Sequence, residues 1–213
     1  MIDEQTDKPK KNSFWRELPI LLGVAILVAV LVRAFVIQTF YIPSQSMEHT
    51  LDINDRVLVN KLVYNFRSPE RGEIIVFRAP GAWHGGEEGS DFIKRVIAVG
   101  GDRVVCCDPQ DRLMINGHSL DEPYIFSEGG VSDPAASQEF DVTIPPGRLW
   151  MMGDHRSASG DSLEHWNRSQ DIDNATIPED AVVGRAFVLF WPFGRATWLS
   201  IPSTFDSVPG PQS

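Results

Sequence analysis

The sequence has few positive charges for its number of negative ones. It holds 19 Lys and Arg against 29 Asp and Glu, which gives a formal net charge of −10. A nucleic-acid partner calls for a basic patch or stripe. The basic residues gather in one place only, near the N-terminus, at Lys8, Lys10, Lys11 and Arg16. We therefore expect no nucleic acid among the partners of this chain.

Cysteine is also scarce, because Cys106 and its neighbour Cys107 are the only two. Neighbouring Cα atoms across a trans peptide are about 3.8 Å apart, below the usual range for a disulfide. Two small residues on a strand are therefore favoured over a vicinal bridge. The sequence contains no Cys-x-x-Cys or His-x-x-x-His spacing. We expect no structural zinc site, and no other metal or cofactor.

A long apolar run, Leu18–Ile37, is interrupted by a single charge at Arg33. About 20 residues at 1.5 Å per residue suffice to cross ~30 Å of hydrocarbon. No small-x-small cleavage site follows the run, so it predicts a retained anchor rather than a cleaved signal peptide. The preceding cations place the N-terminus in the cytoplasm by the positive-inside rule. We expect a single-pass cell-membrane protein, with a cytoplasmic tail over 1–17, an anchor over 18–37 and the remainder on the extracytoplasmic side.

Beyond the apolar run, short strands punctuated by Gly, Pro and Asp predict a mostly β fold. Asn116-Gly117 predicts a hairpin, and Gly100-Gly101-Asp102 predicts another. A polar loop is expected over 82–89, and 121–140 looks irregular. We expect an antiparallel β domain over 38–201, a small inserted β subdomain over about 107–148 and a flexible tail over 202–213. The strands are expected at 56–64, 72–78, 92–99, 103–107, 112–120, 149–152 and 181–190.

A serine in a turn-like segment follows the apolar run directly. Ser46 stands in Pro43-Ser-Gln-Ser-Met47. A serine hydroxyl is a poor nucleophile until a base takes its proton. Ser46 is therefore a candidate nucleophile only if a base lies beside it.

Lys94 is the candidate base. On a two-residue period it shares a strand face with Phe92, Val96 and Ala98, whereas Arg95 lies on the opposite face, where it can reach solvent. Apolar surroundings disfavour the charged amine and lower its pKa, which must fall from ~10.4 to about 7–8 for base catalysis near neutral pH. The alternative is an edge-strand lysine whose amine snorkels to solvent.

The third segment, Gly153-Asp-His-Arg-Ser-Ala-Ser-Gly-Asp-Ser162, is dense in polar side chains and follows a hydrophobic strand. We call it the box. Three segments follow one apolar run in the order 42–47, 92–102 and the box. Together they closely resemble the type I signal peptidases, bacterial membrane-anchored Ser/Lys proteases of the S26 type. The resemblance extends to about Trp198. It implies a serine endopeptidase that cuts signal peptides from exported preproteins after small residues (Ala-x-Ala type), through an acyl-enzyme. Exported preproteins and the lipid bilayer would be its partners.

The resemblance also assigns roles at matching positions. Ser46 would be the nucleophile and Lys94 the general base. Ser44 would offer its hydroxyl to the oxyanion beside the Ser46 backbone N–H, and Ser159 would orient Lys94. The site would be braced by Asp154, Arg156 and Asp161, and pockets for small side chains would be lined by Phe40, Ile42, Met47 and Ile93.

The chain departs from the family pattern at several positions. His49 stands where proline is common, and His155, Ser157 and Ala158 replace residues of a box that often reads Gly-Asp-Asn-Arg-Asp-Asn-Ser. Leu163 replaces an arginine that would pair with Asp161, so we hypothesise that Arg156 takes over. Because eukaryotic relatives use histidine as the base, a Ser/His mechanism through His49 or His155 is the alternative.

Two other functions stay open. One is a different Ser/Lys peptidase, such as a self-cleaving repressor, against which the apolar run and the lack of a basic helix-turn-helix region weigh. The other is a catalytically inactive, anchored envelope protein that binds other factors, against which the presence of both Ser46 and Lys94 weighs. A last feature, the aromatic-rich 187–193 with Trp198, fits a closing core strand, a surface at the lipid interface, or both.

Overall fold

The computed structural model describes residues 14–83 and 89–211. The chain divides into two compact units, Met1–Ile37 and Gln38–Ser213. Several predictions fall outside the described residues, namely the basic cluster at Lys8, Lys10 and Lys11 and most of the loop expected over 82–89.

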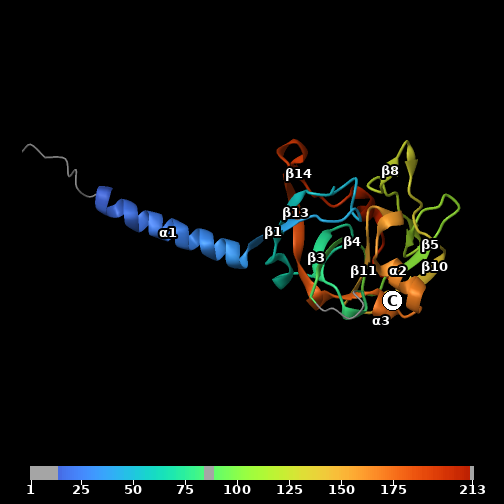
Figure 1. Cartoon of the computed structure of the whole chain (residues 1–213). Coiled ribbons are helices and arrows are strands. Elements are labelled where there is room, and N and C mark those ends of the chain that lie inside the picture. Colours follow the sequence, from blue (N-terminus) through green and yellow to red (C-terminus); the bar gives the residue numbers. More distant parts are fainter. Residues whose placement is uncertain (1–13, 84–88, 212–213) are drawn as a thin grey trace, which may run out of the picture. The chain divides into compact units, whose positions relative to one another are not determined.

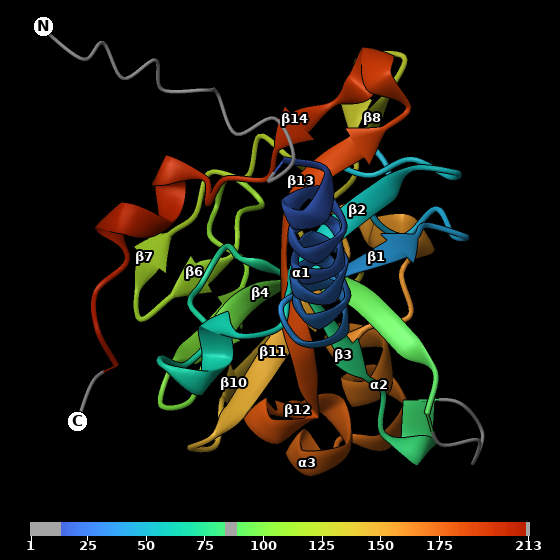
Figure 2. The same cartoon turned by 90° about the vertical axis from the view of Figure 1, so that its left-hand side faces the viewer.

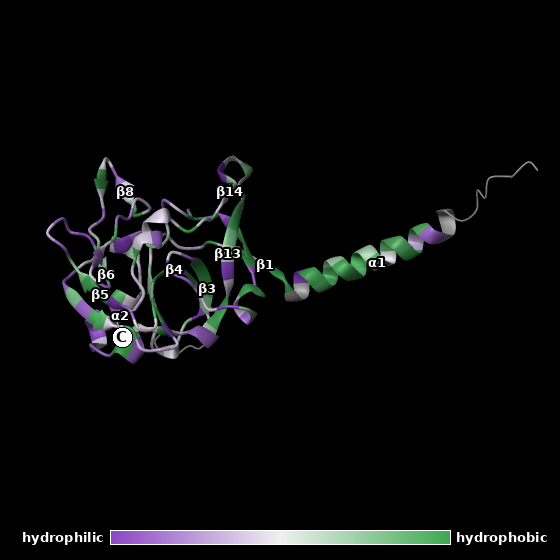
Figure 3. Cartoon of the chain, turned by 180° about the vertical axis from the view of Figure 1, so that it is seen from behind, coloured by the Kyte–Doolittle hydropathy of each residue, from purple (hydrophilic) through white to green (hydrophobic). Residues whose placement is uncertain are grey.

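The first unit contains the helix α1, Phe14–Phe35. This helix begins and ends earlier in the chain than the predicted range 18–37. Ile37, the last residue of the predicted range, is already the first residue of the strand β1. Large apolar side chains along α1 are exposed, from 39% at Val32 to 67% at Ile20, and the helix is predominantly hydrophobic along its length (Figure 3). In the described part of the chain, no helix combines the length and the apolar character that a membrane span requires. The transmembrane anchor stays a prediction.

The second unit is built on an eight-stranded sheet (Figure 1). The pairings from β2 to β12 are antiparallel, as expected. In spatial order the strands are β1 (Ile37–Tyr41), β2 (Arg56–Asn60), β13 (Val182–Trp191), β3 (Ile74–Arg78), β4 (Asp91–Val99), β11 (Arg148–Met152) and β12 (Ile177–Pro178), with β14 (Thr197–Trp198) paired to β13.

Between β4 and β11 the chain leaves the main sheet and builds a second one, on the side of β6 and β7 in Figure 2. The insertion begins at Arg103, earlier than the predicted 107. The Asn116-Gly117 hairpin is confirmed, with Ile115 paired to His118 and φ of 54° and 80° at the two turn residues. The second sheet contains β10 (Phe140–Thr143), β5 (Arg103–Cys106), β6 (Met114–Ile115) and β7 (His118–Ser119), and a separate hairpin joins β8 (Ser127–Glu128) to β9 (Val131–Ser132).

The second predicted hairpin, at Gly100–Asp102, is wrong. β4 pairs with β3 and β11, whereas β5 pairs with β10 and β6, so the turn is a crossover between sheets. The buried Asp102 carboxylate holds this crossover. It accepts hydrogen bonds from Arg71 Nε at 2.7 Å, from Asn116 Nδ2 at 2.8 Å and from the Val99 N–H at 2.9 Å.

Two short α-helices, the first of which begins at the last residue of the box, were not predicted by the sequence pattern. They are α2, Ser162–Ser169, and α3, Ile172–Ala175, and each begins after an aspartate whose side chain accepts a backbone N–H of the first turn. The remaining helical turns are 3₁₀: η1 (Val63–Asn65), η2 (Gly81–Trp83), η3 (Arg156–Ala158), η4 (Glu179–Ala181), η5 (Phe193–Arg195) and η6 (Ser203–Ser207).

The flexible tail expected over 202–213 is wrong for its described part. Residues 203–207 form η6, and the Phe205 and Val208 side chains are buried in the core beside the second sheet. Burial of two large apolar side chains offsets the entropy of ordering a short segment.

The two cysteines also differ from expectation, because a disulfide joins Cys106 to Cys107. The expectation of two separate thiols assumed a trans peptide between them. The peptide is cis, and the two Cα atoms are 3.0 Å apart.

The aromatic segment 187–193 begins in the strand β13 and continues into η5. Leu189 is buried in the core, whereas Trp191 at the end of β13, Phe193 in η5 and Trp198 in β14 are exposed at 43–77%. The core role is confirmed, and contact with lipid stays a prediction.

Candidate active site

Ser46 lies in a tight turn that follows β1. The turn is closed by the Glu48 N–H on the Gln45 carbonyl at 2.9 Å and the Leu51 N–H on the Met47 carbonyl at 2.7 Å. Met47 and Leu51 are fully buried in the apolar cluster beneath the turn. The apolar residues Met47 and Leu51 therefore anchor the turn in the core, while Ser46 lines a neighbouring cleft.

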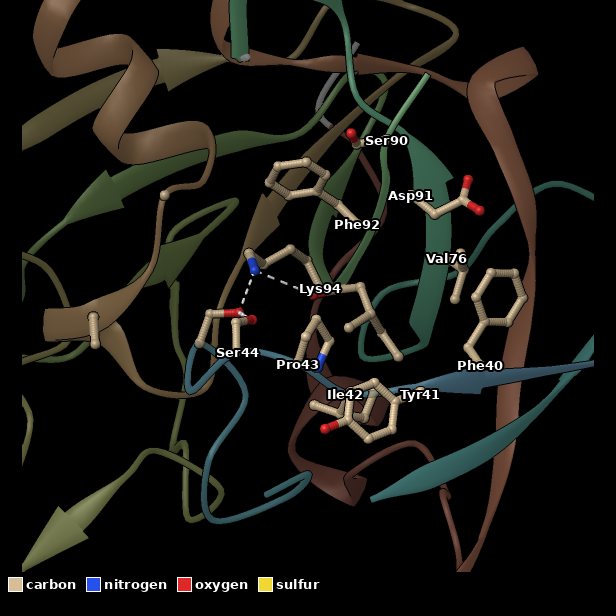
Figure 4. A pocket seen from close by; sticks show the side chains of 14 residues that line it. Phe40, Tyr41, Ile42, Pro43, Ser44, Val76, Ser90, Asp91, Phe92 and Lys94 are labelled. Atoms are coloured by element: carbon tan, nitrogen blue, oxygen red, sulfur yellow. Dashed lines mark hydrogen bonds between the residues drawn. The ribbon is translucent and has the colours of Figure 1, made fainter. Parts of the chain in front are cut away.

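Lys94 comes to Ser46 from β4. Its Nζ donates to Ser46 Oγ at 2.5 Å and to the Ile93 carbonyl at 3.2 Å (Figure 4). The side chain is only 3% exposed, and Nζ lies 5.7 Å from the centroid of the Phe92 ring. The structure thus brings the candidate nucleophile and base together, and the snorkelling alternative for Lys94 is wrong.

The surroundings change the acidity of the amine. Burial lowers the pKa of Lys94 from 10.5 to about 8, although the carboxylates of Asp161 and Asp154 act in the opposite direction. A lysine with a pKa near 8 is half neutral at that pH, whereas one with an ordinary pKa is almost wholly charged. Lys94 can therefore accept the Ser46 proton near neutral pH.

The pH dependence of cleavage should follow this pKa. Since only the neutral amine can act as a base, kcat/KM should rise with pH and level off above about pH 8, and it should be roughly 100-fold lower at pH 6. The measurement is kcat/KM of the detergent-solubilised full chain between pH 5.5 and 10, with a peptide substrate that does not titrate in this range. A limb centred near pH 6.5 would instead indicate a histidine base.

Arg95, the neighbour of Lys94, is buried rather than solvent-directed. Its guanidinium pairs with the Asp154 carboxylate through two bonds of 2.8 and 2.6 Å, and it lies 4.0 Å from the centroid of the Tyr124 ring. Thr50 Oγ1 donates to the same carboxylate at 2.5 Å. The expectation that Arg95 reaches solvent is wrong, because the box supplies a carboxylate on its face of the strand. Asp154 thereby connects β4, the box and the turn of Ser46.

Gly153 and Asp161 fix the shape of the box next to Ser46. The Asp161 carboxylate is buried and accepts the N–H groups of Gly153 at 2.9 Å and Leu163 at 3.1 Å. Burial raises the pKa of Asp161. A Cβ on Gly153 would lie 2.3 Å from the Ser46 carbonyl oxygen and 2.4 Å from Ser159 Oγ, so only glycine fits between them.

Ser159 and Ser44 stand beside the dyad without completing their predicted contacts. The predicted bond of Ser159 to Lys94 is not observed; the Ser159 hydroxyl lies instead at the Asp161 carboxylate, where it partly offsets the effect of burial on that pKa. Ser44 Oγ lies 3.5 Å from Ser46 Oγ. Their roles in orientation and oxyanion binding stay predictions.

Arg156 does not replace the missing arginine partner of Asp161. It pairs instead with Glu122 of the insertion, with Nη2 2.5 Å from Oε1, and donates to the Gly153 carbonyl at 3.0 Å. The hypothesis that Arg156 pairs with Asp161 is wrong, because the partner of its guanidinium is the Glu122 carboxylate of the insertion. Sequence reasoning missed Glu122, which lies in the segment 121–140 that we called irregular.

A cleft of about 380 Å³ opens beside Ser46 and Lys94 (Figure 4). The predicted Phe40, Ile42 and Ile93 line it, whereas Met47 is buried in the core and does not. The cleft is also lined by residues that the sequence did not single out: Tyr41, Pro43, Val76, Ser90, Asp91, Phe92, Ala158 and Gly160.

One backbone edge of β4 is unpaired along this cleft. β3 pairs with β4 from Asp91 to Arg95, but β11 pairs with it only from Arg95 to Val99. On that second edge, residues 91–94 have no partner strand among the described residues. Their backbone groups can accept an extended peptide as an added strand.

Neither histidine is placed as a base for Ser46. His155 Nδ1 lies 3.0 Å from Glu48 Oε2 and 3.2 Å from the Gln45 carbonyl. Among the described residues, the side-chain partners of Ser46 Oγ are Lys94 and Ser44. The geometry therefore favours the Ser/Lys pair over a Ser/His pair.

Metal-binding atoms come together at one place in the described part of the chain, where Cys106, Cys107 and Asp111 lie within 4.8 Å of one another. The disulfide leaves no thiolate there. A thiolate is the form in which cysteine binds metals.

Comparisons with known proteins identify the family. Residues 15–191 match the family model of signal peptidase, peptidase S26. The chain belongs to this family. The enzyme is 35% identical over 230 aligned positions to signal peptidase I of Mycobacterium tuberculosis, covering 90% of this chain and 78% of that protein. It is 37% identical over 205 positions to a probable signal peptidase I-2 of Synechocystis, covering 96% and 86%.

A solved signal peptidase I from Enterococcus faecalis matches 56% of this enzyme and 97% of that chain, with 26% identity and a TM-score of 0.41. Membership in the family makes this chain a peptidase, and hence a hydrolase.

Proposed function

We propose that the enzyme removes signal peptides from exported preproteins by a Ser/Lys mechanism, with Ser46 as the nucleophile and neutral Lys94 as the general base. The observation that carries this proposal is the 2.5 Å contact from Lys94 Nζ to Ser46 Oγ in a site where the pKa of the amine is about 8. A buried, neutralised lysine beside a serine is an activated nucleophile–base pair.

The reaction would proceed in two halves. Lys94 takes the Oγ proton as Ser46 Oγ attacks the scissile carbonyl, and the oxyanion binds the Ser44 hydroxyl and the Ser46 N–H. The Lys94 ammonium then protonates the leaving amine, the C–N bond breaks and an acyl-enzyme remains. In the second half, neutral Lys94 takes a proton from water as the water oxygen attacks the ester carbonyl. The Lys94 ammonium then protonates Ser46 Oγ, the bond between Oγ and the acyl carbon breaks, and the acid is released. Ser159 would orient the amine, and Asp154, Arg156 and Asp161 would hold the surrounding loops.

The substrate would bind as an added strand. The unpaired edge of β4 at 91–94 offers backbone groups to an extended peptide, and the cleft beside it is walled by Phe40, Ile42 and Ile93. Such bulky walls leave room for small side chains, which supports cleavage after an Ala-x-Ala segment.

We also propose that α1 anchors the enzyme in the cell membrane as a single span, with the N-terminus in the cytoplasm and the catalytic unit on the extracytoplasmic side. The exposed apolar side chains of α1 and the basic cluster before it support this topology. The exposed Trp191, Phe193 and Trp198 would rest at the lipid interface and bring the site to membrane-bound substrates.

The test uses the full chain in detergent. It should cleave a preprotein that carries Ala-x-Ala, and a bulky residue in place of either alanine should block cleavage. A penem-type probe should acylate Ser46, as seen by mass spectrometry of the peptide that contains it. If several preproteins stay uncut and no adduct forms, the enzyme proposal fails and the anchored binding protein becomes the better account.

A further inference from the structure

His155 lies at the junction of three segments. Its backbone N–H donates to the Ser46 carbonyl at 3.2 Å. This bond joins the box to the turn that holds Ser46, which we call the nucleophile turn. Its ring stacks on Phe126 of the insertion, with centroids 3.9 Å apart. On the ring, Nδ1 faces the Gln45 carbonyl and Glu48, and Nε2 lies 4.0 Å from Asp133 Oδ2. The side chain is 12% exposed.

The contacts of the His155 ring show which of its two nitrogens carries the proton. Both partners of Nδ1, a carbonyl and a carboxylate, accept hydrogen bonds, so Nδ1 carries the proton in the neutral as well as the charged imidazole. The remaining nitrogen faces Asp133 and not Ser46. His155 is thus a donor to the turn, and it is not a base for the nucleophile.

The carbonyl that the ring holds belongs to a particular peptide group. The Gln45 C=O and the Ser46 N–H are the two ends of one planar trans peptide, and they point in opposite directions. Fixing the carbonyl therefore fixes the direction of the N–H. Among the described residues, no group accepts a hydrogen bond from that N–H, so it is available to a ligand.

We propose that His155 is a positioning residue of the oxyanion site, because its ring N–H holds the Gln45 carbonyl so that the Ser46 N–H points toward the developing oxyanion. The inference rests on the proposed function of Ser46. The Nδ2 of asparagine and the Nδ1 of histidine are separated from Cα by the same number of bonds, so both can donate to the same carbonyl.

The contribution should be partial, because the Gln45 carbonyl also accepts the Glu48 N–H at 2.9 Å. Loss of a whole oxyanion donor costs about 10²–10³ in kcat. We expect His155→Ala to lower kcat for a preprotein, and the rate constant for penem acylation of Ser46, by roughly 10-fold while KM changes less than about twofold. His155→Asn should restore both rates to within about twofold of the wild type.

Two further variants separate donation from packing. His155→Phe keeps an aromatic ring against Phe126 but has no N–H, and it should be as slow as His155→Ala. Ser157→Ala is the matched control, because Ser157 lies in the same loop and contacts Asp133 but not the nucleophile turn, and its rates should equal those of the wild type. The shape of the pH profile should be the same in all variants, since Lys94 sets it.

All rates are expressed per active site, counted by penem titration, so that unfolded protein does not mimic a slow enzyme. A wild-type kcat in His155→Ala would overturn the inference, as would a fast phenylalanine variant or an asparagine variant as slow as alanine. If the wild type itself neither cleaves nor is acylated, the proposed function fails, and the inference fails with it.

Discussion

Replacing Lys94 by methionine should abolish preprotein cleavage and at the same time make the protein more stable. Methionine is nearly isosteric with the lysine stem but has no basic nitrogen, so Ser46 would lose its base. Removal of the nucleophile or base from a serine peptidase lowers kcat by about 10⁴–10⁶-fold. We expect a loss of this size for Lys94→Met, and an equal loss for Ser46→Ala.

The gain in stability follows from the lowered pKa. The pKa of Lys94 is about 8 in the folded protein and 10.5 when unfolded, so at pH 7 the unfolded chain binds this proton more tightly. A difference of this size destabilises the folded protein by about 3 kcal/mol at pH 7. The penalty falls as the pH rises through 8, and it vanishes above 10.5, where the amine is neutral in both states. Loss of the bond to Ser46 Oγ offsets about 1 kcal/mol of the gain.

Lys94→Met should therefore raise the free energy of unfolding by about 2 kcal/mol at pH 7 and leave it nearly unchanged at pH 10. The measurement is unfolding of the full chain in detergent at both pH values. Ser46→Ala is the matched control, because it removes the same hydrogen bond but leaves the buried amine in place, and it should not stabilise the protein. Equal stability of Lys94→Met and wild type at pH 7 would show that the amine has an ordinary pKa.

Local patterns sufficed to find the residues of the site that lie in compact motifs. Ser46, Lys94 and the box each stand in a short segment whose residues are neighbours in the chain. Alternation on β4 also predicted which face Lys94 shares with apolar residues. The hairpin at Asn116-Gly117 could be predicted for the same reason, because its two turn residues both take positive φ.

What the sequence could not supply are partners brought together by the fold. Arg95 is buried only because Asp154, 59 residues away, lies opposite it, and without that carboxylate its strand position favours solvent. Glu122 reaches Arg156 from an insertion whose path has no periodic pattern. The Gly100–Asp102 turn is similar, since the buried network around Asp102 decides between a hairpin and a crossover.

Neutralising Asp154 should have the largest effect on stability. In Asp154→Asn the Arg95 guanidinium, 2% exposed, would stay buried without its counter-charge. Breaking a buried pair by removing one partner costs about 3–5 kcal/mol, because the remaining charge is uncompensated. We expect a loss of this size in the free energy of unfolding of the full chain. Cleavage should also be slower, because the Thr50 hydroxyl, in the turn of Ser46, would bind a neutral amide of the box in place of a carboxylate.

The double variant Arg95→Met/Asp154→Asn distinguishes the charge from the shape of the site. Removing both charges takes away the uncompensated guanidinium, so most of the lost stability should return, whereas activity should not, since the Thr50 hydroxyl still meets a neutral amide in place of the Asp154 carboxylate. The exposed pair of Arg103 and Asp141 has similar bidentate geometry, and Asp141→Asn should hardly change the melting temperature. Equal losses in Asp154→Asn and Asp141→Asn would contradict this account, because the two pairs share their bidentate geometry but differ in burial.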